Sequence, residues 1–408
     1  MMNCRQNPLW RIGVAGLIAV CGTLLWTAQQ SQAQDLAGFA ARALKPGSEI
    51  DHTAVQELRN LGPEAVQYLL SHEELKQAPH WSEVLDTVAQ QKEAQYSGLY
   101  WYTDLDQALQ VARRDKKPVL SLRLLGKLTD ELSCANSRFF RTTLYPNAQV
   151  RELLANHFVL HWQSVRAVPI ITIDFGDGRQ IKRTITGNSL HLVLDHQGRA
   201  VDVLPGLYGA GAFVRELQLS GPAAVRFSQA EGSMFQHQRA AYHQTQLNAL
   251  LERWNSDCQT AKVTPTSPVG IGQDDSIWSK VALLYNAESM PTGAAQQAVA
   301  AAAPAAVAGR IAISKAVVEN PILRQMRNLT QSISEDTVRN QYQLHFRIHT
   351  WFAKELVVQE RELLVARVYS ELFLSPLNDP WYGLSKPDTY SAIKADGRID
   401  AVSQNTRR

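Results

Sequence analysis

The chain has 408 residues, of which 45% are hydrophobic and 19% are charged, and it carries a formal net charge of +3 at pH 7. This length is enough for one large domain or for two to three ordinary ones. A protein that binds nucleic acid by neutralising phosphates needs a basic surplus or a long basic run, whereas the run at residues 113–117 is short and is interrupted by Asp115. The composition therefore excludes nucleic acid as an expected partner.

The first 33 residues have the pattern of a secretory signal peptide. Arg5 and Arg11 give a positive start, residues 12–26 form an apolar run, and the small residues Ser31 and Ala33 offer a cleavage site. An apolar run of about 15 residues is short for a membrane span, which needs roughly 20. We therefore expect cleavage after Ala33, which gives an exported chain, periplasmic or secreted, with no stable membrane span.

Cleavage would leave Cys134 and Cys258 as the cysteines of the mature chain, together with 39 basic and 38 acidic residues. Disulfides persist in exported proteins, but two cysteines do not make a disulfide scaffold. Three states of Cys134 stay open on the sequence alone. It is an inert, partly buried thiol, a reactive single thiol, or one half of a disulfide with Cys258.

Composition and apolar spacing divide the chain into six segments. We expect a signal peptide at 1–33, a small helical region at 34–95, an α/β domain at 96–219, a helical extension at 220–260, a linker at 261–310 and a mainly helical C-terminal region at 311–408. Apolar residues at helical spacing predict one long helix from Met234 to Cys258. The run Thr337–Phe373 contains neither Pro nor Gly and predicts another long helix.

The α/β domain is predicted from strand-like and helix-like runs in alternation. Strands are expected at residues 99–102, 118–125, 158–162, 170–173, 180–185, 190–195 and 200–204. Helices are expected after a cap at Thr103 or Asp104, from Cys134, after Asn147 and over Ala212–Leu219, and the glycines of residues 176–178 predict a hairpin turn. Early strands that alternate with helices and later strands that form hairpins predict an α/β fold with a mixed sheet and flanking helices.

Several runs in this domain carry a resemblance to a known family. Residues 116–120 read Lys-Lys-Pro-Val-Leu before the turn that holds Cys134, and residues 187–195 read Gly-Asn-Ser-Leu-His-Leu-Val-Leu-Asp. Between them, residues 147–160 have the pattern of a helix that leads directly into a strand. With these features residues 96–219 resemble exported thioredoxin-like domains, and the resemblance implies a thioredoxin fold with thiol–disulfide chemistry.

The resemblance places Cys134 where the family has the nucleophilic cysteine of its C-x-x-C motif, and Ser137 where it has the resolving cysteine. A cysteine in the first turn of a helix meets unpaired N–H groups and the positive end of the helix dipole, which favour the thiolate. The hydroxyl of Ser137 could donate a hydrogen bond to that thiolate, but it cannot release a mixed disulfide. We therefore take Cys134 and Ser137 as the candidate catalytic residues of a monothiol site.

Asn188 and Ser189 are the candidate binding residues, since the resemblance places them opposite Cys134. They could bind an extended peptide or the thiolate, or they could be ordinary turn residues before a strand. The sequence departs from the family at Ser189, which replaces a cis-proline, and at Leu132-Ser133, where the family has a tryptophan. The strand at 119–125 also lacks the carboxylate that the family often buries there.

Two function hypotheses follow for an exported thioredoxin-like protein. In the first, Cys134 exchanges with thiols or disulfides of other proteins through a mixed disulfide. In the second, the chain is a redox-inert thioredoxin-fold module that serves protein binding or assembly. Neither hypothesis requires a cofactor.

Two further features of the sequence have simple structural interpretations. The segment at residues 165–186 is expected to be a tight hairpin, with partner contact as the alternative. His345 and His349 are four residues apart, which would suit a metal pair on a helix, but no Glu-x-x-His pattern accompanies them. We therefore expect a packed or solvated pair and no metal ion.

Overall fold

The computed structural model describes residues 33–184, 187–265, 267–268, 275–289, 332–355 and 360–382, with the single residues 393 and 397. The expected signal peptide, apart from its last residue, and most of the expected linker lie outside these residues. The chain divides into two compact units, Met1–Tyr100 and Trp101–Arg408, and each is described by itself.

The first unit is a small helical assembly. It contains a helix at residues 33–43, α2 (His52–Asn60), α3 (Pro63–Ser71), α4 (Trp81–Ala89) and the short α5 (Ala94–Ser97). Asp51 caps α2 by accepting a hydrogen bond from the amide of Ala54. Gly62 has φ = 82°, a conformation open to glycine, and it turns the chain directly into Pro63 at the start of α3. Buried aliphatic side chains such as Leu58 and Leu85 form the core of this unit.

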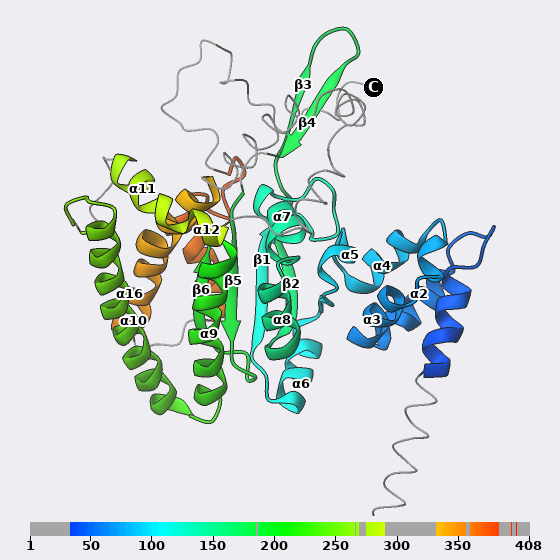
Figure 1. Cartoon of the computed structure of the whole chain (residues 1–408), viewed down its shortest axis with the longest axis horizontal. Helices are drawn as coiled ribbons and strands as arrows, with labels where there is room; N and C mark the ends of the chain where they lie inside the picture. Colours follow the sequence, from blue (N-terminus) through cyan, green and yellow to red (C-terminus); the bar gives the residue numbers. More distant parts are fainter. Residues whose placement is uncertain are drawn as a thin grey trace, which may run out of the picture. The chain divides into compact units, whose positions relative to one another are not determined.

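The second unit contains a mixed four-stranded sheet, which confirms the predicted mixed α/β fold with flanking helices. Its strands are β1 (Val119–Leu125), β2 (Val159–Arg166), β5 (Ser189–Leu194) and β6 (Ala200–Pro205), in the order β2-β1-β5-β6. Strand β1 runs parallel to β2 and antiparallel to β5, and β5 pairs with β6 in antiparallel fashion (Figure 1). All seven residues of β1 are buried, as a central strand requires.

Helices flank this sheet as the sequence predicted. They are α6 (Leu105–Asp115), α7 (Ala135–Phe139) with the π-helical turn η2 (Phe140–Leu144), α8 (Ala148–His157) and α9 (Ala210–Phe227). Asp104 caps α6 by accepting from the amide of Gln107 at 2.9 Å, and the side chain of Asn147 caps α8. Helix α6 contacts β1 and β2, and α8 packs beside α9.

Helix α9 is longer than expected. The prediction ended it at Leu219, before Gly221 and Pro222, but it continues through both residues to Phe227. Proline in a helix removes one hydrogen bond and normally ends the helix. Here the residues after Pro222 bury Ala224 and Phe227, and Gly221 leaves room for the ring of Phe158, so packing outweighs the local preference.

Several of the described elements after α9 pack onto the β6 edge of the sheet. The described elements after α9 are α10 (Gly232–Thr260), α11 (Asp275–Ala282), η3 (Leu283–Tyr285), α12 (Asn286–Ser289), η4 (Asn340–His345), α16 (Phe346–Lys354), α17 (Arg361–Arg367) and η5 (Val368–Leu372). Helices α10 and α16 pack together, and η4 and α16 contact β6. Helix α11 lies inside the expected linker, where Trp278 packs against Trp254 of α10 with ring centroids 5.1 Å apart.

The prediction of one continuous helix over Thr337–Phe373 is wrong. Helix α16 ends at Lys354, Glu355 has extended backbone angles, and α17 begins at Arg361. The carboxylate of Glu355 lies 2.7 Å from the guanidinium of Arg367 in α17. This ion pair links the residue after α16 to α17 across the break. The first helix ends there although the run contains neither Pro nor Gly.

The expected hairpin is present and forms a sheet of its own. Strand β3 (Ile170–Asp174) pairs with β4 (Gln180–Thr184), and Gly176 and Gly178 both have positive φ in the turn. Figure 1 shows this hairpin beyond the end of the four-stranded sheet of the same unit.

His191 of β5 provides a test of the core through pH. It lies between the rings of Phe140 and Phe213, each with its centroid 4.9 Å away, and its Nε2 is 2.9 Å from the hydroxyl of Tyr145. Burial lowers the pKa of His191 to about 3. Since the unfolded chain takes up this proton near pH 6.5, folding stability should fall as the pH drops from about 6.5 to 3, by up to about 1.4 kcal/mol per pH unit.

Urea unfolding followed between pH 7 and 4 checks this expectation. We expect the loss of stability with falling pH to be shallower in His191→Gln, which keeps a hydrogen-bonding side chain but does not titrate. His157 is exposed on α8, and His157→Gln is the matched control whose slope should equal that of the parent. Equal slopes in the parent and His191→Gln would contradict the assignment.

Candidate functional site

Cys134 lies where the sequence predicted it, at the start of a helix that follows the central strand. It is the N-cap residue of α7, and its amide donates to the carbonyl of Leu125 at the end of β1 at 3.3 Å. The sulfur accepts a hydrogen bond from the backbone N–H of Ser137 at 3.4 Å. The side chain is fully buried, with 0% exposure, so the thiol does not reach the surface of this structure.

Ser137 is close to Cys134 but does not use its hydroxyl on the sulfur. The hydroxyl donates to the carbonyl of Cys134 at 2.8 Å, and the side chain is completely buried. The expectation of a hydrogen bond from this hydroxyl to the thiolate is therefore corrected, because the backbone amide of Ser137 makes that contact. The hydroxyl closes the first turn of α7 instead, as serine commonly does at helix starts.

Arg141 holds the loop before Cys134, and sequence reasoning missed it. Its buried guanidinium donates to the carbonyl of Asp130 at 2.6 Å, to the hydroxyl of Ser133 at 2.9 Å and to the carbonyl of Glu131 at 3.3 Å. A planar fork with several donors suits this set of converging acceptors. In the sequence nothing separates Arg141 from its neighbour Arg138, since only the folded loop brings the acceptors together.

Ser189 lies beside α7, as the resemblance implied. Its hydroxyl accepts a hydrogen bond from the side-chain amide of Asn136 at 3.1 Å. The side chain of Asn188 donates to the hydroxyl of Ser375 at 2.9 Å, and its carbonyl accepts from the hydroxyl of Tyr369 at 3.0 Å. The side chains of both candidate binding residues therefore form hydrogen bonds with other residues of the chain.

Residues 368–382, which we call the C-terminal cover, close this end of the sheet. Tyr369 and Tyr382 are buried, and burial raises the pKa of both phenols, with a further rise from the nearby thiol of Cys134. Arg166 of β2 stacks over the ring of Tyr382 at 4.4 Å and donates to the carbonyl of Asp379 at 2.7 Å. Contacts from β2 and from Asn188 thus fix the cover on both sides of the site.

Cys258 is not a partner of Cys134. It lies in the last turns of α10, in a cluster with Trp254 and Trp278, and burial raises its pKa to about 11. Both cysteines are free thiols. The disulfide that the sequence left open is therefore absent between these two described residues.

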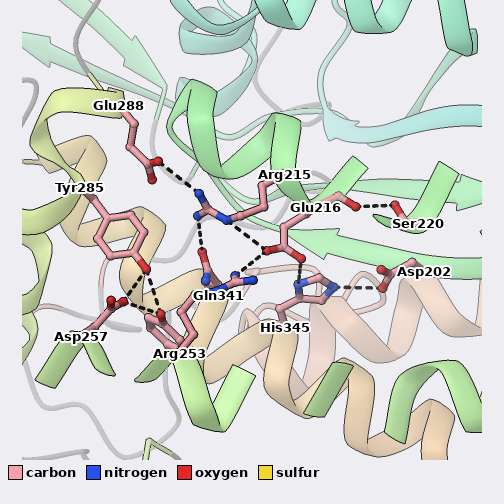
Figure 2. A network of polar contacts seen from close by, with 11 residues as sticks. Asp202, Arg215, Glu216, Ser220, Arg253, Asp257, Tyr285, Glu288, Gln341 and His345 are labelled. Carbon is pink, nitrogen blue, oxygen red and sulfur yellow. Dashed lines mark hydrogen bonds and ion pairs between the residues drawn. The ribbon is translucent and has the colours of Figure 1, made fainter. Parts of the chain in front are cut away.

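The sequence did not predict a second polar cluster, which is built around His345 of η4 and includes Asp202 of β6. The Nε2 of His345 lies 3.0 Å from a carboxylate oxygen of Asp202, and its Nδ1 lies 3.9 Å from Glu216 of α9. Figure 2 shows His345 between these two carboxylates, with Arg253 of α10 bound to Glu216 at 3.1 Å and Arg215 bound to Glu288 at 3.2 Å.

The charges of this cluster follow from burial and pairing. Burial acts to raise the pKa of Asp202, but His345 outweighs it, and the net effect is a lowered pKa. Burial acts to lower the pKa of His345, and Asp202 reverses that effect, so the net shift is upward. Asp202 and His345 therefore form a buried ion pair that joins β6 to η4, and the structure buries His349 next to it.

Comparison with protein-family models, with curated protein sequences and with solved structures found no match. Among the described residues, no helix has both the length and the apolar character needed to cross a membrane.

The cover can be tested by weakening one of its hydrogen bonds. Tyr369→Phe removes the bond to the carbonyl of Asn188, which should cost about 1 kcal/mol of cover stability. If Cys134 reacts only when the cover opens, its alkylation rate should rise roughly fivefold in that variant. The measurement is the rate of Cys134 modification by a thiol reagent, read by mass spectrometry of the native protein.

Tyr100→Phe supplies the matched control. The Tyr100 hydroxyl also donates to a backbone carbonyl, that of Arg59 at 3.0 Å, but within the first unit. This variant should leave the labelling rate of Cys134 unchanged. A Tyr369→Phe protein that labels at the parental rate would show that the cover does not limit access.

Proposed function

We propose that this chain is an exported protein-binding module on a thioredoxin-like scaffold, in which Cys134 is closed and takes no part in thiol–disulfide exchange. The scaffold part of the proposal draws support from the layout of the sheet. A helix that begins with Cys134 follows the central strand β1, and the β5–β6 hairpin precedes α9, which closes this domain, as the resemblance predicts.

The burial of the Cys134 sulfur is the observation that carries the proposal. In thiol–disulfide exchange, a thiolate must approach the sulfur of a partner disulfide along an open path. Cys134 and Ser189 are both at 0% exposure, and the hydroxyl of Tyr369 donates to the backbone carbonyl of Asn188. Access would require displacement of the cover, which is held by Arg166 as well as by Asn188.

The exposed β3–β4 hairpin supplies a binding surface for this module. Five large apolar side chains on it are exposed by 37% to 53%, namely Ile170, Ile171, Ile173, Phe175 and Ile181. Ile173 stands opposite Ile181 in the register, so their side chains share one face of the hairpin. Exposed apolar patches of this kind mark interaction sites, and a lone two-stranded hairpin is only marginally stable in water.

The hairpin also connects to the loop around Cys134. The hydroxyl of Thr184, at the end of β4, donates to the carbonyl of Ser133 at 3.3 Å. Arg183 stands opposite Ile171 on the apolar face. A partner protein that presents apolar side chains together with acidic ones would match this face, through burial and charge.

Alkylation of the native mature protein separates the binding module from a monothiol enzyme. We expect Cys134 to react far more slowly in the folded protein than in denaturant, with the modified residue identified by mass spectrometry. Ser256 is exposed on α10, and Ser256→Cys is a positive control that should react at once in the folded protein. Rapid modification of native Cys134 would overturn the proposal in favour of a reactive single thiol.

The hairpin surface is tested by a double change that keeps strand propensity. Peptides that carry apolar and acidic residues are first selected on the parent protein from a displayed random library. The double variant Ile173→Thr with Ile181→Thr should bind these peptides at least tenfold more weakly, because each substitution removes about 1–2 kcal/mol of apolar burial. Leu251→Gln, which removes an apolar side chain exposed by 38% on α10, should leave that affinity unchanged. Equal binding by the double variant and the parent would contradict this surface.

A further inference from the structure

Three buried side chains from three separate elements bring metal-ligand atoms together. Asp202 lies on β6, His243 on α10 and His349 on α16, and one donor atom of each lies within 4.8 Å of the donor atoms of the other two. All three side chains are at most 1% exposed. The residues are far apart in the sequence, so the packing of α10 and α16 against the edge of the sheet creates the cluster.

The orientation of His243 is set by the backbone of β6. Its Nε2 lies 2.8 Å from the carbonyl of Val201. A carbonyl can only accept a hydrogen bond, so Nε2 carries the proton and Nδ1 carries a lone pair. Metal-ligating histidines have this arrangement, in which the far nitrogen donates to a carbonyl and the near nitrogen is free to coordinate.

The lone pair of His243 points at a second imidazole. Its Nδ1 lies 2.7 Å from the Nδ1 of His349. Two facing imidazole nitrogens can share one proton, or both can coordinate a cation that takes the place of that proton. With a shared proton, the Nε2 of His349 becomes a buried acceptor, and this atom has no hydrogen-bond partner in the described part of the chain. An unsatisfied buried acceptor costs about 1–3 kcal/mol, so the hydrogen bond between the two rings leaves one polar atom of the pair without compensation.

Asp202 places a carboxylate, which is paired with the His345 imidazolium, beside the two imidazoles. Its Oδ1 accepts from His345 Nε2 at 3.0 Å and from the amide of Val203 at 2.8 Å, which holds the carboxylate in place. The nearby cation Arg253 is already paired with Glu216.

We propose that Asp202, His243 and His349 form a binding site for a divalent transition-metal ion of the zinc type. Two imidazole nitrogens and one carboxylate oxygen are a ligand set that suits zinc, with one position left for water. The Val201 carbonyl and His345 orient the ligands without binding the ion. A metal there would cross-link β6, α10 and α16, and this site is independent of the proposed binding function.

Titration with Co(II) alone tests the site in the full mature protein after treatment with a chelator. We expect one equivalent to bind with visible absorption bands of a four-coordinate ion, Zn(II) to displace it, and the melting temperature to rise with metal. His349→Gln should weaken binding at least tenfold. His237→Gln changes an exposed histidine of the same helix, α10, and should bind like the parent.

A second variant keeps the test decisive if the glutamine variant unfolds. His349→Cys retains a ligand at this position, and it should add a near-ultraviolet sulfur-to-cobalt charge-transfer band. The proposal is overturned if the folded parent binds no Co(II), or if folded His349→Gln and His349→Cys proteins bind it with the parental affinity and spectrum.

Discussion

Strand β6 pairs with only one other strand of the sheet, β5, so the backbone hydrogen-bonding groups on its outer edge need other partners. The helices that supply these partners determine much of the packing of the second unit. Backbone carbonyls on an open edge need partners or invite association with other chains. Here Arg239 and His243 of α10 donate to the carbonyls of Ala200 and Val201 at 3.3 Å and 2.8 Å. This covering requires the long α10 to run along the edge, and it brings the later helices η4 and α16 against β6.

The same covering of β6 positions both the histidine cluster and the residues around Cys134. Because η4 and α16 pack against β6, His345 and His349 meet Asp202 and His243 in the interior. Because α17 and η5 follow α16, the chain returns to the other end of the sheet and places Tyr369 against Asn188. The C-terminal cover, with Tyr369 and Tyr382 near Cys134, is therefore held by the same packing.

Local sequence signals were reliable where the structure itself is local. Asp104 and Asn147 begin helices as their side chains predict, and the glycines of residues 176–178 form the expected hairpin turn. The signals misled where distant contacts decide the outcome. Pro222 does not end α9, because Ala224 and Phe227 after it are buried. The run Thr337–Phe373, which has neither Pro nor Gly, breaks after Lys354, where Glu355 pairs with Arg367.

The sequence by itself determined the mixed α/β fold and the position of Cys134 at a helix start, because strand periodicity, turn residues and caps act over a few neighbours. The family resemblance, not a local pattern, pointed to Ser189, whose hydroxyl accepts from Asn136 of that helix. Only the tertiary structure decided that the thiol is buried, that Arg141 binds the loop before it, and that His349 faces His243 rather than pairing with His345 as two ligands on one helix. Those features depend on contacts between segments more than a hundred residues apart, or on the exact path of a loop, and no local pattern encodes them.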